Sequence, residues 1–144
     1  MSGILLDTNA LVWFLAGDAM VDDALVAIAD AQRVGRLHVS PISAWEAAVA
    51  LRKPDPGRRP DLGGREAAAW FRQALRLTGA RLASVGRRIA LEAARVPEVY
   101  GRGDPGDCFL IATARVKKVP VVTRDEAMLR LAADRPDYLT AIRC

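Results

Sequence analysis

Short apolar segments alternate with helical segments along the whole chain, and this alternation determines the class of fold. Strands are expected over 3–7, 37–40, 80–85, 119–123 and 138–140. Helices are expected over 10–15, 22–34, 42–52, 67–78, 87–95, 104–117 and 125–133. Strands joined by helices pair in parallel, because a parallel neighbour needs a crossover connection. The sequence therefore predicts an α/β sandwich around a mostly parallel sheet, with residues 1–144 as a single domain.

Proline and glycine mark several of the expected element ends. Gly17 and Gly35 follow apolar helical segments, and Pro41 stands at the start of another. The segment 53–64 (KPDPGRRPDLGG) is the richest in both residue types, so we expect it to be the least ordered loop.

The bulk composition excludes several classes of protein. With 144 residues, 51% of them hydrophobic, the chain has the size and apolar content of one domain with a core. No apolar run approaches the ~20 residues that span a bilayer, and the first residues lack a basic leader, so we expect a cytoplasmic protein and no membrane partner. The net charge of +4 comes mostly from arginine, which suits phosphate binding but equally follows from GC-rich codon usage.

Few residues of the chain can hold a soft metal ion. The sequence has two cysteines and one histidine, too few for a disulfide framework or a zinc site. Any bound metal must therefore be held by oxygen, which favours Mg²⁺ or Mn²⁺.

Four acids stand at expected strand-to-helix junctions or near helix starts, and each has an ordinary structural explanation. Asp7 and Asp125 follow expected strands and are suitable helix N-caps. Asp104 precedes Pro105 in the usual order of a cap and a first helical residue, and Asp107 falls in the first turn, where the helix dipole favours an acid.

Glu46 is harder to explain in this way. It is the only charged residue between Pro41 and Leu51, and it shares a helical stripe with Ile42 and Val49. An unpaired carboxylate on a core-facing stripe costs several kcal/mol of desolvation, on the order given by transfer data. The alternatives are a glutamate at the edge of the buried face or one paired with an arginine.

Taken together, the acids point to a metal site. The carboxyl ends of parallel strands meet along one edge of a sheet, where ligands bind. Carboxylates gathered there repel one another unless they bind protons or share a cation. We therefore predict a cage of oxygen ligands for Mg²⁺ or Mn²⁺, which would activate water for attack on a phosphoryl group.

The segments that carry these acids resemble those of PIN-domain ribonucleases, and specifically the VapC toxins of bacterial type II toxin–antitoxin systems. The similarity spans nearly the whole chain in four ordered segments: Leu5-Leu6-Asp7-Thr8-Asn9, Ser43-Ala44-Trp45-Glu46, Asp104-Pro105-Gly106-Asp107 running into Leu110-Ile111-Ala112-Thr113-Ala114, and Val122-Thr123-Arg124-Asp125. Each segment alone is a weak signal, and the four in order are a specific one.

The resemblance implies a PIN-like three-layer α/β/α sandwich with about five strands, a homodimer, and a VapB antitoxin that neutralises the protein. It implies an Mg²⁺-dependent endoribonuclease that leaves a 5′-phosphate and a 3′-hydroxyl and inhibits translation and growth. The residues that it makes metal-site acids are Asp7, Glu46, Asp107 and Asp125. It gives secondary positions to Asp104, Asn9 and Thr123, while Arg102 and Arg124 are our candidates for RNA contacts.

The chain departs from the family pattern at two places. Cys108 stands where an arginine is usual, and Gly101-Arg102-Gly103 replaces a common His-Arg before the Asp-Pro. Neither change removes an acid, but both affect expected RNA contacts, so a PIN module that binds without cleaving stays open as an alternative. A phosphoacceptor receiver domain is disfavoured, because Asp7 is followed by Thr8-Asn9 rather than by a second acid and no lysine follows the 119–123 strand.

The aromatic residues and the histidine have mainly structural explanations. Trp13, Trp45 and Trp70 lie among apolar neighbours on expected helices, which favours core or dimer packing over base stacking. His38 lies in an expected buried strand and is interpreted as structural.

Overall fold

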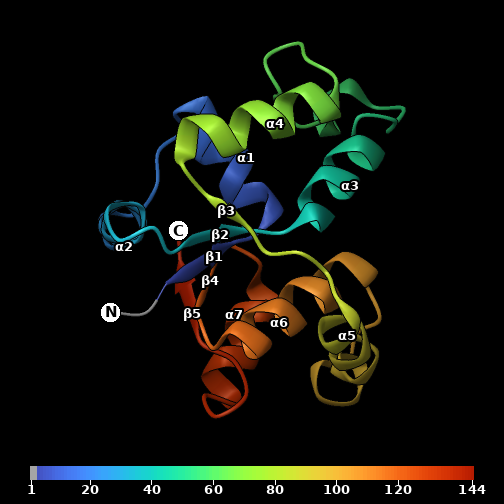
Figure 1. Cartoon of the computed structure of the whole chain (residues 1–144). Helices are drawn as coiled ribbons and strands as arrows, with labels where there is room; N and C mark the ends of the chain where they lie inside the picture. Colours follow the sequence, from blue (N-terminus) through green and yellow to red (C-terminus); the bar gives the residue numbers. More distant parts are fainter. Residues whose placement is uncertain (1–2) are drawn as a thin grey trace.

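A five-stranded sheet runs through the middle of the molecule (Figure 1). The computed structural model describes residues 3–144. The strand order is β3-β2-β1-β4-β5, and all four pairings are parallel. The strands are β1 (Ile4–Leu6), β2 (Leu37–Val39), β3 (Arg81–Leu82), β4 (Val121–Thr123) and β5 (Ala141–Arg143). The predicted parallel sheet is therefore confirmed, and it is parallel throughout.

Helices cover both faces of this sheet, which makes three layers (Figure 1). One layer holds α1 (Thr8–Ala16), α2 (Asp22–Arg33), α3 (Pro41–Ala50) and α4 (Ala67–Thr78). The other holds α5 (Arg87–Tyr100), α6 (Pro105–Lys117) and α7 (Glu126–Asp134). The predicted α/β/α sandwich is confirmed.

The central strand shows how the sequence produces two cores. Ile4 and Leu6 pack with the α1–α4 layer, whereas Leu5 packs with the α5–α7 layer, because successive side chains of a strand point to opposite faces. Leu5 and Leu6 are both fully buried. A strand buried on both faces is expected to be apolar at every position, which explains why β1 reads as a continuous apolar run.

Helix α5 is longer than the sequence predicts. The expected end at residue 95 is wrong, since the helix continues through Pro97 to Tyr100. Val96 is fully buried against the second core, and Gly101 ends the helix in a left-handed conformation with its N–H bonded to the Pro97 carbonyl. Tertiary burial and a glycine cap thus outweigh the lost proline hydrogen bond.

The last strand also differs from the prediction. Residues 138–140 are not a strand, and β5 begins only at Ala141. Tyr138 lies in a turn in which its N–H bonds to the Arg135 carbonyl, while its own carbonyl accepts a 2.7 Å hydrogen bond from Arg115. The Arg115 guanidinium also stacks 3.7 Å from the Tyr138 ring centroid. The backbone N–H and carbonyl of Tyr138 therefore already have partners and are not free to pair with a neighbouring strand.

The proline- and glycine-rich segment makes several hydrogen bonds of its own. It contains the 3-10 helix η1 (Pro56–Arg58), capped by the Asp55 carboxylate. Arg59 Nε donates to the Lys53 carbonyl at 2.8 Å, which closes the loop. Leu62, only 3% exposed, anchors the segment in the first core.

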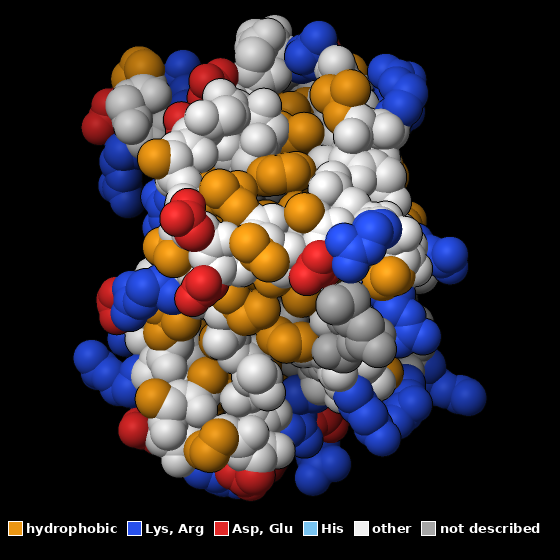
Figure 2. Space-filling view, turned by 90° about the vertical axis from the view of Figure 1, so that its left-hand side faces the viewer, with side chains coloured by type: hydrophobic (Ala, Val, Ile, Leu, Met, Phe, Trp, Pro, Cys, Tyr) orange, Lys and Arg blue, Asp and Glu red, His pale blue; other side chains and the backbone are white. Residues whose placement is uncertain are grey.

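Helix α2 leaves apolar side chains uncovered. It buries Ala24, Ile28 and Ala31, while Leu25 and Val26 are exposed. Figure 2 looks onto the side where α2 and the N-terminus lie, and shows hydrophobic side chains in a band with Lys and Arg mostly around it. None of the helices described in residues 3–144 is both long and apolar enough to cross a membrane.

Candidate functional site

Two acids are brought together by neighbouring strands. Asp7 follows β1 and Asp125 follows β4, and these strands pair in parallel, with the Asp7 N–H bonded to the Val122 carbonyl. Asp7 accepts a 2.7 Å hydrogen bond from the Ala10 N–H, and Asp125 accepts one of 3.0 Å from the Met128 N–H. Both acids are therefore helix N-caps, and each keeps a second carboxylate oxygen for other partners.

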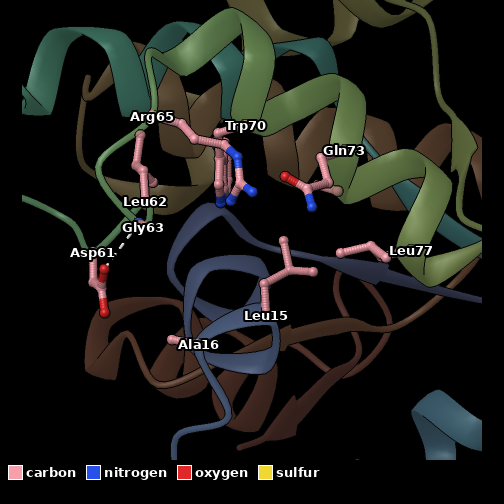
Figure 3. Close-up of a pocket in the computed structure, with 10 residues that line it drawn as sticks. Leu15, Ala16, Asp61, Leu62, Gly63, Arg65, Trp70, Gln73 and Leu77 are labelled. Carbon is pink, nitrogen blue, oxygen red and sulfur yellow. Dashed lines mark hydrogen bonds between the residues drawn. The ribbon is translucent and has the colours of Figure 1, made fainter.

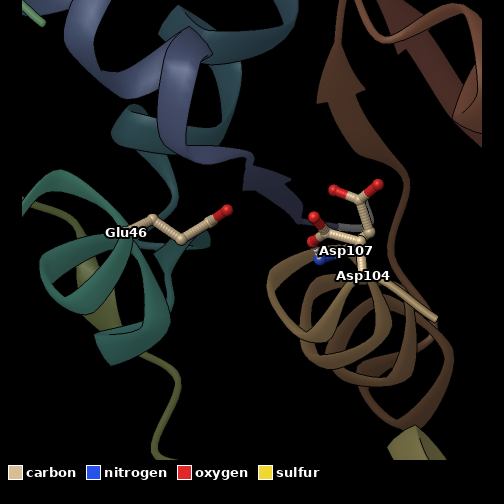
Figure 4. Close-up of side chains that lie close together, drawn as sticks. All are labelled: Glu46, Asp104 and Asp107. Carbon is tan, nitrogen blue, oxygen red and sulfur yellow. Dashed lines mark hydrogen bonds between the residues drawn. The ribbon is translucent and has the colours of Figure 1, made fainter. Parts of the chain in front are cut away.

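The other acids come from helices in opposite layers. Glu46 extends from α3 toward the first turn of α6, which carries Asp104 and Asp107 (Figure 4). Asp104 caps α6 by accepting from the Asp107 N–H at 3.0 Å. One oxygen from each of these three carboxylates lies within 4.8 Å of the others, so one cation can contact all three.

A cavity at this edge of the sheet collects most of the residues predicted from the sequence. Its empty volume is about 520 Å³, open space included, and it is lined by Asp7, Thr8, Asn9, Trp13, Glu46, Asp107, Leu110, Arg124 and Asp125. We call it the acid pocket. Four acids that are up to 118 positions apart in the chain thus share one cavity.

Burial raises the pKa of three of these acids. Desolvation is the largest cause at each, and the nearby carboxylates add to it by repulsion. The pKa of Asp7 and that of Asp107 rise to about 6, and the pKa of Glu46 rises to about 7. Because the ionised carboxylates are disfavoured in this pocket, a cation bound among them would stabilise the cluster.

Hydroxyl groups hold the acids in position. Thr8 donates to Glu46 and lies 2.9 Å from the Ser43 hydroxyl, which ties α1 to α3. Tyr100 donates to Asp107 at 2.9 Å. Thr8, Ser43 and Tyr100 were not predicted as site residues. The first two lie within the quoted motifs, and Tyr100 lies beyond the expected end of its helix.

Thr123, predicted as a polar residue that orients the acids, is not among the residues that line the pocket. It is fully buried, and its hydroxyl accepts from the Asp125 N–H at 2.9 Å. A side-chain hydrogen bond from Thr123 also lowers the pKa of Asp7, partly offsetting burial. Thr123 therefore contacts two of the four acids, whereas Asn9 lines the pocket itself.

The two candidate arginines differ in position. Arg124 lines the acid pocket, with its guanidinium 4.0 Å from the Trp13 ring centroid and a 2.6 Å hydrogen bond to the Ala19 carbonyl. Arg102 is exposed and is not among the residues that line the pocket. Cys108 is buried, with its thiol 3.7 Å from the Arg102 carbonyl, so packing accounts for its position.

Gly106 lets α3 and α6 approach closely. A Cβ at this position would lie 2.3 Å from Glu46 Oε2 and 2.5 Å from Cδ. Gly106→Ala should therefore move the Glu46 carboxylate away from Asp104 and Asp107 while leaving the fold intact, because the obstructing group is the end of a flexible side chain. We expect Mn²⁺ affinity, measured by calorimetry, to fall about 10- to 100-fold, the range seen when ligand-positioning contacts are lost.

The matched control is Gly103→Ala, whose Cβ would meet no atom within 4 Å. It should bind Mn²⁺ like the parent. Equal affinity for all three proteins would contradict a role for the Glu46–Gly106 contact.

A separate cavity, with an empty volume of about 470 Å³, open space included, is lined by α4, the end of α1 and the loop over residues 61–65 (Figure 3). Trp70 is buried there, as expected for a packing residue, and Asp61 accepts a hydrogen bond from the Gly63 N–H at 3.0 Å. Asp61 is the only acid in its lining, so this cavity does not compete with the acid pocket.

The remaining residues considered from the sequence divide by exposure. Trp13 is partly buried, but Trp45 is 50% exposed, so core packing is wrong for Trp45, while packing in a dimer stays a prediction. His38 lies in β2, outside the acid pocket, and its Nδ1 is buried without a hydrogen-bond partner.

Known proteins share this architecture. Residues 4–134 match the family described as PIN domain. Among solved structures, a chain of DNA-bound VapBC from Salmonella typhimurium has a TM-score of 0.64 at 16% identity, covering 99% of this chain and 98% of that one. VapBC-5 from Mycobacterium tuberculosis gives 0.58 at 18% identity, covering 99% and 98%. FitAcB from Neisseria gonorrhoeae gives 0.59 at 18%, covering 96% of each chain.

No curated protein sequence matches the chain. At such low sequence identities the similarity to the solved structures shows a shared fold and nothing more. The family match, in contrast, spans the strands and helices that carry every acid of the pocket. The chain belongs to the PIN domain family.

Proposed function

We propose that this protein is a metal-dependent endoribonuclease toxin of the VapC type, built as one domain over residues 1–144. The observation that carries the proposal is the acid pocket, in which Asp7, Glu46, Asp107 and Asp125 line one cavity. Structural acids that served only as helix caps would have no reason to share a cavity with a half-buried glutamate from another helix.

The donor set fits Mg²⁺ or Mn²⁺. The pocket offers carboxylate oxygens and the Asn9 side chain, and neither histidine nor cysteine lines it. Hard divalent cations prefer oxygen ligands of this kind. Burial is the main cause of the raised pKa of Asp7, Glu46 and Asp107, neighbouring carboxylates add to it, and a bound divalent cation would offset both. We assign the four acids as its ligands, with Asp104 as a further carboxylate within reach.

In the proposed mechanism, Asp7, Glu46, Asp107 and Asp125 would hold Mg²⁺, which would supply a lowered pKa for the attacking water and a positive charge for the scissile phosphate. The chain's own residues provide the geometry. Thr8 and Tyr100 hold the carboxylates of Glu46 and Asp107 in fixed orientations. Arg124, fixed against Trp13, places a positive charge at the pocket wall for a phosphate oxygen. Hydrolysis would leave a 5′-phosphate and a 3′-hydroxyl.

We further propose that a VapB-type antitoxin neutralises the protein, that it acts as a cytoplasmic homodimer, and that RNA cleavage inhibits translation and growth. The solved structures with this fold include toxin–antitoxin complexes, such as one from Klebsiella pneumoniae with a TM-score of 0.57. The uncovered apolar side chains of α2 are suitable for a protein interface.

The direct test is cleavage of RNA by the purified protein. Total RNA incubated with protein and Mg²⁺ should yield fragments with recurrent 5′-phosphate ends, located by sequencing of those ends. Excess EDTA should stop the reaction. Cleavage that persists in EDTA, or ends without a 5′-phosphate, would contradict the proposed chemistry.

Binding of the metal should also stabilise the fold, because an ion that binds only the native state raises the free energy of unfolding by mass action. At a Mg²⁺ concentration 100 times the dissociation constant, the gain is about 2.7 kcal/mol. We expect the melting temperature to rise through a Mg²⁺ titration followed by circular dichroism. K⁺ at equal ionic strength is the control, and a flat Mg²⁺ titration would count against the metal site.

A further inference from the structure

A groove adjoins the acid pocket on the side of α3. Its empty volume is about 1280 Å³, open space included, and Thr8, Asn9, Trp13 and Glu46 line both cavities. The groove also includes Trp45 and Val49 of α3, the loop around η1, and Asp104 and Pro105 at the start of α6. A polymer held at the acid pocket therefore has a continuous path into this groove.

Trp45 makes part of the groove wall both apolar and exposed. It is 50% exposed, and Val49, one helical turn later, is 49% exposed, so the two form an uncovered apolar stripe. Trp45 lines the same groove as Glu46, one of the proposed metal ligands. Large aromatic side chains are normally covered in a folded domain, and this one faces a cavity instead.

Basic side chains lie at the loop side of the same groove. Arg59 is occupied with the carbonyls of Lys53 and Pro54. Lys53 and Arg58 form no ion pair with any acid in the described part of the chain, so their charges are available to a ligand. Asp18 and Asp61 also line the groove, but the Asp61 carboxylate is directed to the Gly63 amide.

We propose that this groove receives one unstacked nucleotide next to the scissile phosphate of a single-stranded RNA, with its base on Trp45 and its phosphate near Lys53 and Arg58. The inference rests on the proposed ribonuclease function and adds a substrate contact to it. An exposed indole beside free cations suits a base and its phosphate, which together combine an aromatic face with negative charge. An apolar peptide would cover Trp45 and Val49 but would leave those two cations unmatched.

The test is a double-mutant cycle between the indole and the base. Binding is measured by fluorescence anisotropy in an Asp7→Asn background, which prevents cleavage, with a short RNA that spans a mapped cleavage site. Trp45→Ala should weaken binding about 10-fold or more, the range for loss of one base-stacking aromatic, and Trp45→Phe should restore most of it. Removing the base at one position beside the scissile phosphate should weaken RNA binding to the protein that keeps Trp45. The same abasic RNA should bind the Trp45→Ala protein as tightly as intact RNA does.

Leu91→Ala is the matched control, because Leu91 is 63% exposed on α5 and outside the groove. If the parent binds RNA but Trp45→Ala and every abasic RNA bind equally well, this inference fails and the ribonuclease proposal stands. If Trp45→Ala instead converts a dimer to a monomer in light scattering with RNA binding unchanged, a second copy covers the groove. A parent that neither binds nor cleaves RNA overturns both proposals.

Discussion

Asp7→Asn is expected to abolish RNA cleavage and, without metal, to melt at the same temperature as the parent or a few degrees higher. Cleavage should fall more than about 100-fold, because a metal ligand contributes at least as much as the contacts that orient it. The separation of the two effects is what identifies a functional acid. Substitution of a purely structural residue would instead lower the melting temperature and the cleavage activity together.

The stability half of this expectation follows from burial. Asp7 is 7% exposed, and burial raises its pKa to about 6. Above that pH, the metal-free protein carries an unfavourable buried charge that asparagine lacks. Asparagine also retains a side-chain oxygen for the Ala10 N–H, so the helix cap is preserved. Asp7→Ala, which removes the cap as well, should be less stable than Asp7→Asn by about 1 kcal/mol.

Melting curves in EDTA and cleavage assays in Mg²⁺ would measure the two effects. Asp22→Asn is the control, since Asp22 lies exposed in the first turn of α2 and should change neither quantity appreciably. A large drop in the melting temperature of Asp7→Asn would instead make Asp7 chiefly a structural cap.

The second expectation concerns pH. Metal-free protein should lose stability as the pH rises from about 4 to about 7. In the unfolded chain the carboxyl pKa values are 3.8 for Asp7 and Asp107 and 4.5 for Glu46, and in the folded protein they rise to about 6, 6 and 7. The folded state therefore binds protons more tightly than the unfolded state in this range, so raising the pH favours unfolding.

The size of this loss of stability can be estimated from Asp7. One pKa unit corresponds to about 1.36 kcal/mol, so the change at Asp7 alone amounts to about 3 kcal/mol. Glu46 and Asp107 contribute in the same direction, although the three acids are coupled and their effects do not simply add.

Urea unfolding at a series of pH values in EDTA would measure this loss. Saturating Mg²⁺ should remove or reverse it, because the ion needs the deprotonated carboxylates. A free energy of unfolding that rises with pH in EDTA would be contrary to the raised pKa values, and the Asp7→Asn protein should show a smaller slope than the parent.

The sequence was sufficient to predict the sandwich because its signals are local. Strands such as β1 are buried on both faces and are therefore apolar at every position, and Pro41 and Pro105 mark helix starts. Asp7 and Asp125 could be placed together because the ends of parallel strands meet at one edge, whereas the assignment of all four acids to one metal site also needed the family resemblance. The strand and helix signals follow rules of chain geometry that need no knowledge of tertiary contacts.

Other features depended on tertiary contacts that the sequence does not display. Helix α5 passes Pro97 because Val96 is buried in the core that α5 shares with α6, and this extension is what brings Tyr100 to Asp107. The last strand starts after Tyr138 because Arg115, from another helix, holds the turn there. The exposure of Trp45 could not be predicted either, since the residues next to it in the sequence are mostly apolar.

The arrangement of Glu46 opposite Asp104 and Asp107 has a consequence for motion. These acids belong to helices on opposite faces of the sheet, so a shared ion would bridge the two outer layers of the molecule (Figures 1 and 4). Amide protons of α3 around Glu46 and of the first turn of α6 should then exchange with solvent more slowly once the ion is bound. Loss of the ion would then allow the two layers to move more freely at the edge of the sheet where we propose that RNA binds.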